Sequence, residues 1–119
     1  MDREYKFKRG DIILSTMAPN DFVAQQPILV LKNMTGDSKV DSFCNLCIGK
    51  SCKPILYWQN PDCAKFYDGP EEDIRYQILK NISKFILGEL TDIQLETMIG
   101  KIYYFPIIKL LNEYKENYA

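Results

Sequence analysis

Apolar residues form short runs in the first half of the chain and recur at helical spacing in the second half. Ile12–Leu14 and Ile28–Leu31 are β-rich runs, and we expect them to be neighbouring strands joined by a long loop. A third run, Lys53–Trp58, has Pro54 near its start, where a missing N–H is tolerated. The pattern therefore predicts a small β-rich unit in the first half.

The second half has apolar positions three to four residues apart, which predicts amphipathic helices. The helical spacing begins at Ile74, and this first helix is expected to end at Gly88. Thr91, with a glutamine three residues later, predicts a capping box at the start of a second helix. Pro106 is expected to kink or end that helix, leaving a tail helix over Ile107–Lys115. The expected buried positions are Ile78, Leu79, Ile82, Phe85 and Ile86 in the first helix and Leu95, Met98, Ile99 and Ile102 in the second.

Strands first and helices last predict an α+β fold. The chain has 119 residues without a repeat or linker, so we expect a single domain over residues 1–119. A net charge of −1 argues against a strongly basic nucleic-acid-binding module, but not against a local basic patch. No apolar run has the length of a membrane span, and the first residues lack a signal peptide's apolar core. We therefore expect a cytoplasmic protein that does not contact membranes.

Histidine is absent from the chain. Its absence removes the side chain that most often acts as a base near neutral pH, together with every Ser–His or Cys–His pair. Any enzyme chemistry would have to use the remaining polar and charged side chains.

Four short motifs occur in the order and spacing of a known family. Lys8–Ile12 and Pro27–Leu31 resemble the first two strands of the MazF/PemK toxins, which read Lys-Arg-Gly-Asp-Ile, a loop, then Arg-Pro-apolar-apolar-Val. Glu72–Arg75 resembles that family's Asp-Gln-Ile-Arg strand. Ile86–Asp92 is similar to the joint before its last helix. The segment from about residue 40 to 68 has no match.

The resemblance implies an SH3-like β-barrel with two or three C-terminal helices, a homodimer, and cleavage of single-stranded RNA under the control of an antitoxin. It places Gln26 where the family has its active-site Arg. Metal-independent cleavage needs a base, a proton donor and a cation over the phosphate. Gln26 cannot be that cation. Glu72 as base and Arg75 as cation are therefore the candidate catalytic residues of an endoribonuclease, provided that they face one cleft.

Arg9, Gln26 and Lys32 flank the N-terminal strands and are the candidate RNA-binding residues. Simpler interpretations stay open: Arg9 and Lys32 as solvated charges at strand edges, and Glu72 with Arg75 as an exposed helical pair. The leading hypothesis is a MazF/PemK-like toxin, or a derivative, acting on single-stranded RNA. The alternative is a non-enzymatic interaction protein of phage or mobile-element origin that uses the barrel to bind a protein partner.

The four cysteines all lie in the unmatched segment, with the spacing C-x2-C-x4-C-x10-C. One alternative is a structural zinc held by four thiolates, although the spacing fits no common zinc module. The other is that they are small buried apolar side chains, so that no cofactor is needed. The residues concerned are Cys44, Cys47, Cys52 and Cys63.

Aromatic residues predict two further kinds of contact. Tyr57–Trp58 and Phe66–Tyr67 could stack on bases of a single strand, or fill a core. The segment Tyr103–Ile108 is apolar enough for us to expect it to pack against a second copy of the chain.

Overall fold

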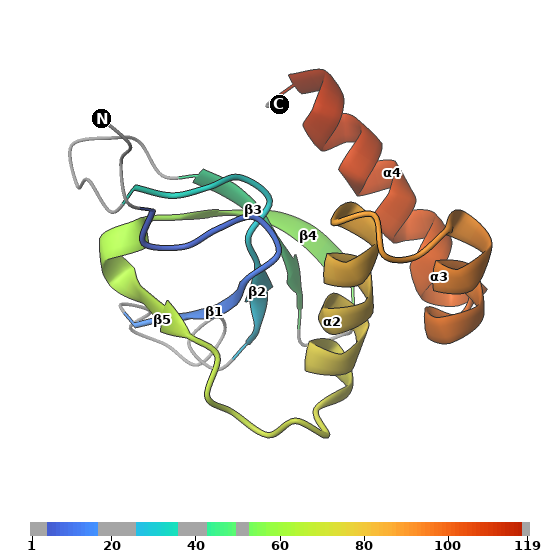
Figure 1. Ribbon diagram of the computed structural model, residues 1–119, viewed down its shortest axis with the longest axis horizontal. Coiled ribbons are helices and arrows are strands. Elements are labelled where there is room, and N and C mark those ends of the chain that lie inside the picture. The colour runs from blue at the N-terminus through green and yellow to red at the C-terminus, as the bar shows by residue number, and fades with distance from the viewer. Residues whose placement is uncertain (1–4, 17–25, 36–42, 50–52, 118–119) are drawn as a thin grey trace.

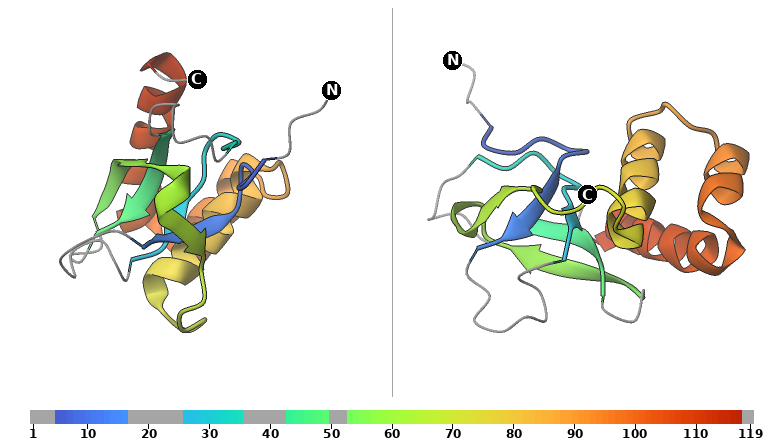
Figure 2. Two further views of the ribbon diagram at one scale, coloured as in Figure 1. Left: turned by 90° about the vertical axis from the view of Figure 1, so that its left-hand side faces the viewer. Right: turned by 90° about the horizontal axis from the view of Figure 1, so that it is seen from below.

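The computed structural model describes residues 5–16, 26–35, 43–49 and 53–117. These residues form an antiparallel sheet, a short 3₁₀ helix and three α-helices, which confirms the predicted α+β class. The helices gather on one side of the sheet (Figures 1 and 2). The elements are β1 (Ile12–Ser15), β2 (Ile28–Leu29), β3 (Phe43–Ile48), β4 (Pro54–Gln59), η1 (Pro61–Cys63), β5 (Ala64–Phe66), α2 (Ile74–Ile86), α3 (Asp92–Ile99) and α4 (Lys101–Asn117).

The sheet has the strand order β4-β3-β2-β1-β5, so the first four strands form a meander and β5 returns to pair with β1. Ile12 pairs with Leu29, which confirms that the two N-terminal apolar runs are neighbours. Most of the long loop expected between them, residues 17–25, lies outside the described residues. The pairings define an open five-stranded sheet, and its closure into an SH3-like barrel stays a prediction.

The central strands are buried on both faces of the sheet. Successive side chains of a strand point to opposite faces, so each strand contributes to two cores. Leu29 and Leu46 belong to the core between the sheet and the helices, whereas Ile28 and Cys47 belong to a core on the other face. This second core also contains Phe7, Ile13, Val30, Met34 and Ala64.

Two strands were not predicted from the sequence. The central strand β3 contains Asn45, whose buried Oδ1 accepts a hydrogen bond from the backbone N–H of Leu31 at 3.1 Å. A buried polar residue and two cysteines hide the apolar pattern of this strand. β5 has only three residues, Ala64–Phe66, and so short a strand leaves no apolar run in the sequence.

Helix α2 begins and ends close to the predicted positions. Asp73 is its N-cap, and Gly88 follows its end with φ +82°. The predicted capping box of the next helix is present, with Thr91 and Gln94 bonded reciprocally. The segment Glu72–Arg75 resembles a strand of the MazF/PemK family but starts a helix here, so that structural expectation was wrong.

Gly100, not Pro106, separates the last two helices. Gly100 has φ +85°, a conformation that favours glycine, and the chain turns there from α3 into α4. Pro106 lies inside α4 near its start, where it removes a single backbone hydrogen bond, to the carbonyl of Ile102. Because of this turn, Met98 and Ile102 are exposed, while the other two predicted positions, Leu95 and Ile99, are buried.

Candidate functional site

The Lys-Arg-Gly-Asp motif forms a tight turn before β1. The Asp11 carboxylate accepts a hydrogen bond from the backbone N–H of Lys8 at 2.8 Å, and the backbone N–H of Asp11 donates to the Lys8 carbonyl at 3.0 Å. Gly10 has φ +98°, and a Cβ at this position would lie 2.8 Å from a side-chain carbon of Leu87. The positive φ therefore favours glycine at this turn, which lies close against the end of α2.

This turn fixes Arg9 at the C-terminal end of α2. Ser83 donates through its hydroxyl to the carbonyl of Gly10 at 2.6 Å, and Arg9 Nη2 donates to the carbonyl of Ile86 at 3.3 Å. The last carbonyls of a helix lack intrahelical donors and carry partial negative charge, so a guanidinium is favoured there. Arg9 is exposed to solvent, so its charge stays available to a ligand.

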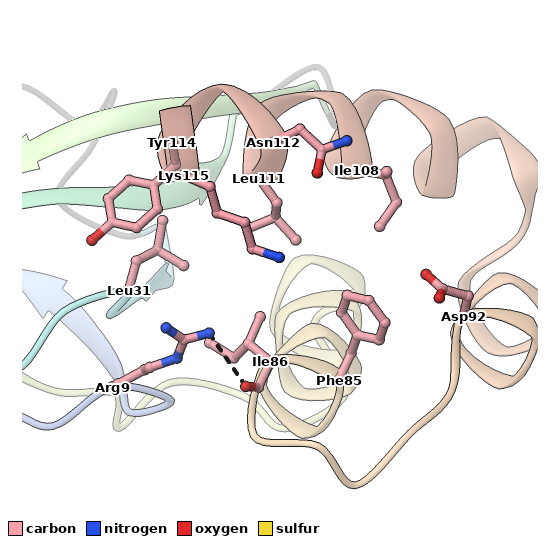
Figure 3. Close-up of a pocket in the computed structure, with 10 residues that line it drawn as sticks. All are labelled: Arg9, Leu31, Phe85, Ile86, Asp92, Ile108, Leu111, Asn112, Tyr114 and Lys115. Atoms are coloured by element: carbon pink, nitrogen blue, oxygen red, sulfur yellow. Dashed lines mark hydrogen bonds between the residues drawn. The ribbon is translucent and has the colours of Figure 1, made fainter. Parts of the chain in front are cut away.

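A cavity of about 300 Å³ opens beside Arg9, between the end of α2 and one face of α4 (Figure 3). We call it the Arg9 cleft. Its apolar walls come mainly from the two helices, and its polar groups lie around them. The lining residues are Arg9, Leu31, Phe85, Ile86, Asp92, Ile108, Leu111, Asn112, Tyr114 and Lys115.

A second hollow of about 270 Å³ continues from the cleft towards the residues that follow β2. Lys32 and Asn33 line it, and it shares Arg9, Leu31 and Tyr114 with the Arg9 cleft. Asn33 accepts a hydrogen bond from the backbone N–H of Arg9 at 2.7 Å, which ties these two segments together. The structure thus brings together two of the three predicted RNA-binding residues, Arg9 and Lys32.

Positive charge dominates one side of the Arg9 cleft. The exposed side chains of Arg9 and Lys115 lie on this side, and Figure 3 shows the Lys115 amine reaching into the middle of the cavity. The opposite side carries Asp92, whose Oδ1 accepts a hydrogen bond from the hydroxyl of Tyr104 at 3.1 Å. Such an arrangement suits an anionic ligand with an apolar body.

The candidate catalytic residues lie at the other end of α2. Arg75 donates through Nε and Nη2 to both carboxylate oxygens of Asp73, at 3.1 and 2.8 Å. The same carboxylate caps the helix by accepting the backbone N–H of Arg75 at 2.8 Å. These hydrogen bonds lower the pKa of Asp73 and raise that of Arg75. The partner of Arg75 is therefore Asp73, where the sequence suggested Glu72.

Glu72 is exposed just before the helix, whereas the Arg75 side chain is about one-fifth exposed. Arg9 and Arg75 lie at opposite ends of α2. At 1.5 Å per residue, the first turn of the helix is about 16 Å from the Ile86 carbonyl that Arg9 contacts. The predicted residues therefore divide between two places and do not form one site.

Gln26 is 1% exposed, although we expected it to contact RNA. Its side-chain oxygen accepts a hydrogen bond from the Cys47 thiol at 3.4 Å. Burial raises the pKa of Cys47 to about 12, even with the charge of Arg75 acting in the opposite direction. The thiol therefore stays protonated at neutral pH, and the Gln26 amide is part of the second core. A direct contact between Gln26 and RNA does not fit this burial.

The strand geometry argues against the four-cysteine zinc site. Cys44 lies in the core beneath the helices, whereas Cys47 lies in the core on the opposite face of β3. Two thiols on opposite faces of a strand cannot bind the same tetrahedral ion. Cys52 lies outside the described residues, and among those described no group of three potential ligands could hold a metal ion.

The aromatic pairs that could stack on bases lie on the edge strands β4 and β5, with Tyr67 directly after β5. Trp58 and Phe66 are more than half exposed. Tyr67, in contrast, stacks on Tyr76 with ring centroids 4.4 Å apart. Phe66 also contacts Phe7 edge to face, so part of its surface is used within the molecule.

Sequence reasoning missed the residues that α3 and α4 supply to the cleft. Asp92 is the first residue of α3, and Asn112 and Lys115 lie three residues apart on α4. That spacing places the α4 side chains on one helical face, which was the available signal. Nothing in the sequence indicated that this face would lie opposite Arg9.

Within the described part of the chain, no helix combines the length and the apolar character needed to cross a membrane. The chain was compared with protein-family models, with curated proteins and with solved structures, and none of these comparisons found a match.

Proposed function

We propose that this chain is a MazF/PemK-like protein that binds single-stranded RNA through the Arg9 cleft, acts in the cytoplasm as a homodimer, and is bound by a small antitoxin protein. The observation that carries the proposal is that Arg9 and Lys32, selected from the sequence, lie together at a hollow that continues into the cleft of Lys115. Cations on one surface supply the phosphate contacts that dominate RNA affinity.

The strand order supports the fold part of this proposal. In a small barrel, the sheet encloses one core while its outer face packs on other elements. Here the second core lies on the face away from the helices, and both edge strands contribute to it, β5 through Ala64 and β4 through Ile55 and Tyr57. An SH3-like barrel closed around this core is the arrangement that we propose.

The geometry favours binding over cleavage. Cleavage at the start of α2 would need Arg75 to stabilise a phosphate, but its guanidinium is already bonded to Asp73. A phosphate would have to compete with a bidentate, partly buried ion pair. At the Arg9 cleft, Arg9 is exposed and bonded to a neutral carbonyl, so a phosphate would compete with a weaker contact there.

Binding is tested by fluorescence anisotropy with a labelled, unstructured RNA at several salt concentrations. We expect the logarithm of the affinity to fall linearly with the logarithm of the salt concentration. Replacing Arg9 and Lys32 together by Gln should reduce that slope by about 2. A double replacement of Lys80 and Lys84 by Gln, on α2, is the matched control. Equal slopes for the two double variants would contradict the proposed RNA surface.

Cleavage is tested with a long, weakly structured RNA in EDTA, with Arg75→Ala and Glu72→Ala prepared in parallel. We expect binding without discrete cuts. Sequence-specific cuts that disappear in both variants would instead establish a metal-independent endoribonuclease that uses these residues.

A second candidate function, the binding of a protein partner, is favoured by exposed apolar side chains on α3 and α4. Ile93 is 77% exposed and Ile102 is 84% exposed, and Met98 and Phe105 also face solvent. Large exposed apolar patches mark protein–protein interaction sites, which makes the exposed apolar residues of these two helices candidates for such a contact. This surface fits the predicted homodimer or an antitoxin.

The oligomeric state decides whether these exposed residues bind a second copy of the chain or a different protein. Sedimentation equilibrium should give a dimer for the unmodified chain and a monomer for Ile102→Glu, with Lys84→Glu as a control that stays dimeric. A monomer for the unmodified chain would leave the exposed surface to a different protein.

A further inference from the structure

The two sides of the Arg9 cleft carry opposite charges, with apolar walls between them. Arg9 and Lys115 lie on one side and Asp92 on the other. Figure 3 shows the Asp92 carboxylate directed towards Phe85 and Ile108, which form the wall between the charges. A ligand that fills the cavity would need an anionic group, a flat apolar body and N–H donors at its far end.

A nucleotide has these three parts in this order. The volume of about 300 Å³ lies at the lower end of the range of small-molecule sites, which suits a single nucleotide unit. A phosphate is favoured by two cations, and a base can lie on the ring of Phe85. The apolar walls would exclude water from both faces of the base.

The carboxylate selects among the bases. An ionised carboxylate only accepts hydrogen bonds, and its two oxygens can accept two parallel donors. Guanine presents such a pair on one edge, its ring N–H and its exocyclic amino group, whereas the corresponding edge of adenine alternates a donor with an acceptor. The hydroxyl of Tyr104 uses only part of the acceptor capacity of Asp92 and holds the carboxylate in place.

We propose that the Arg9 cleft is a guanine-nucleotide pocket, in which Asp92 binds the donor edge of the base, Phe85 contacts its face, and Arg9 with Lys115 binds the phosphate. This inference deepens the proposed function, because it names the nucleotide that a bound RNA inserts. Asn112, also directed at the cavity in Figure 3, supplies an amide that can bond to the base or the sugar.

The test is isothermal titration of the full chain with GMP, AMP and guanosine. A bidentate contact to the correct base discriminates by about tenfold or more, so GMP should bind at least that much more tightly than AMP. Guanosine should bind more weakly than GMP, because it lacks the phosphate. Equal affinities for GMP and AMP, or no binding of either, would overturn the pocket.

Two variants separate the contacts to the base and to the phosphate. Asp92→Asn should abolish the preference for GMP over AMP, whereas Lys115→Gln should weaken GMP and AMP by the same factor and leave guanosine unchanged. Lys109→Gln is the control, because Lys109 lines a different groove of α4, next to Pro54. A preference for GMP that survives Asp92→Asn would remove Asp92 from the pocket and contradict the proposal.

RNA binding separates this inference from the proposed function. Two unstructured RNAs that differ only in having every G replaced by A are titrated, with GMP as competitor. Preference for the G-containing RNA and competition by GMP support both proposals. Equal binding of both RNAs without competition by GMP would refute the pocket and leave RNA binding intact. Binding of GMP but of neither RNA would support the pocket and refute the proposed function.

Discussion

The two ends of α2 each hold an arginine, but in opposite circumstances. At the N-terminal end, Arg75 forms a bidentate ion pair with Asp73, the helix cap. At the C-terminal end, Arg9 makes one hydrogen bond to the Ile86 carbonyl and stays exposed beside a cavity. Arg75 is therefore part of the helix cap, whereas Arg9 is held at the end of the helix with its guanidinium exposed to a ligand.

This contrast follows from the helix dipole. A guanidinium in the first turn of a helix faces the positive end of the dipole and needs a carboxylate to offset the unfavourable interaction. At the last turn the backbone itself attracts the cation, and no side-chain partner is required. The location of an arginine on a helix therefore decides how much of its charge can be used by a ligand.

The largest expected effect comes from placing the family's arginine at the position of Gln26. Because this side chain is buried and bonded to the Cys47 thiol, Gln26→Arg should lower the free energy of unfolding by about 3 kcal/mol, the cost of an uncompensated buried charge. Urea denaturation measures the change. Gln26→Met, which introduces no charge, should cost less, about 1 kcal/mol. A stable Gln26→Arg variant that cleaves RNA would show that position 26 is open to solvent and contradict its burial.

Next in size is Arg75→Gln at the N-terminal end of α2. It leaves the partly buried Asp73 carboxylate without its strongest partner, and we expect a loss of about 2 kcal/mol in the free energy of unfolding. RNA affinity should be unchanged. Glu72→Gln, at an exposed neighbour, is the matched control and should change stability by less than about 0.5 kcal/mol. Loss of RNA binding without loss of stability in Arg75→Gln would reverse the roles that we assign to the two arginines.

Arg9→Gln should give the complementary result at the C-terminal end. Affinity for unstructured RNA should fall by up to about tenfold, with the salt slope reduced by about 1, while the unfolding curve stays close to that of the unmodified chain. Arg9→Lys keeps the charge and should retain most of the affinity, because phosphate attraction depends on charge more than on the guanidinium shape. Equal losses in both variants would indicate a structural role for Arg9.

How much of this fold the sequence predicts depends on whether an element is defined by local signals in the sequence or by contacts with distant segments. Periodic apolar spacing and a capping box located the starts of α2 and α3, because both signals are local. β3 could not be predicted in the same way, since its buried Asn45 bonds to the backbone of Leu31 and its cysteines lie in cores built by distant segments. Pro106 misled the prediction because the effect of a proline depends on where its helix begins, and Gly100 sets that point.

The site shows the same division between local and distant information. Arg9 was found because the turn that holds it is a continuous motif, whereas Asp92 and Lys115 reach the cleft through the packing of helices that follow much later. The pairing of Arg75 with Asp73 in place of Glu72 depended on a cap geometry that fixes the neighbouring carboxylate. Sequence reasoning therefore identified individual groups better than their partners.

The smallest effect that distinguishes the two ends is a dependence on pH. The pKa of Asp73 is lowered in the folded protein because Arg75 donates to its carboxylate, so the folded state binds its proton less readily than the unfolded chain. The stabilisation from this pair is therefore fully present above the ordinary pKa of about 3.9 and is lost as the pH falls through the lower folded value. Asp73→Asn keeps a good cap but lacks the ion pair, and should be less stable by about 1 kcal/mol at neutral pH.

Urea denaturation of both proteins between pH 2 and pH 7 measures this difference. The two free energies of unfolding should converge at the acid end, because every other carboxylate is common to both chains and cancels. Arg9→Gln, compared in the same way, should show no such convergence, since the Arg9 side chain bonds to a carbonyl that does not titrate. A constant difference between Asp73→Asn and the unmodified chain at all pH values would mean that the Asp73 charge does not contribute to stability, and the contrast between the two arginines would then rest on exposure alone.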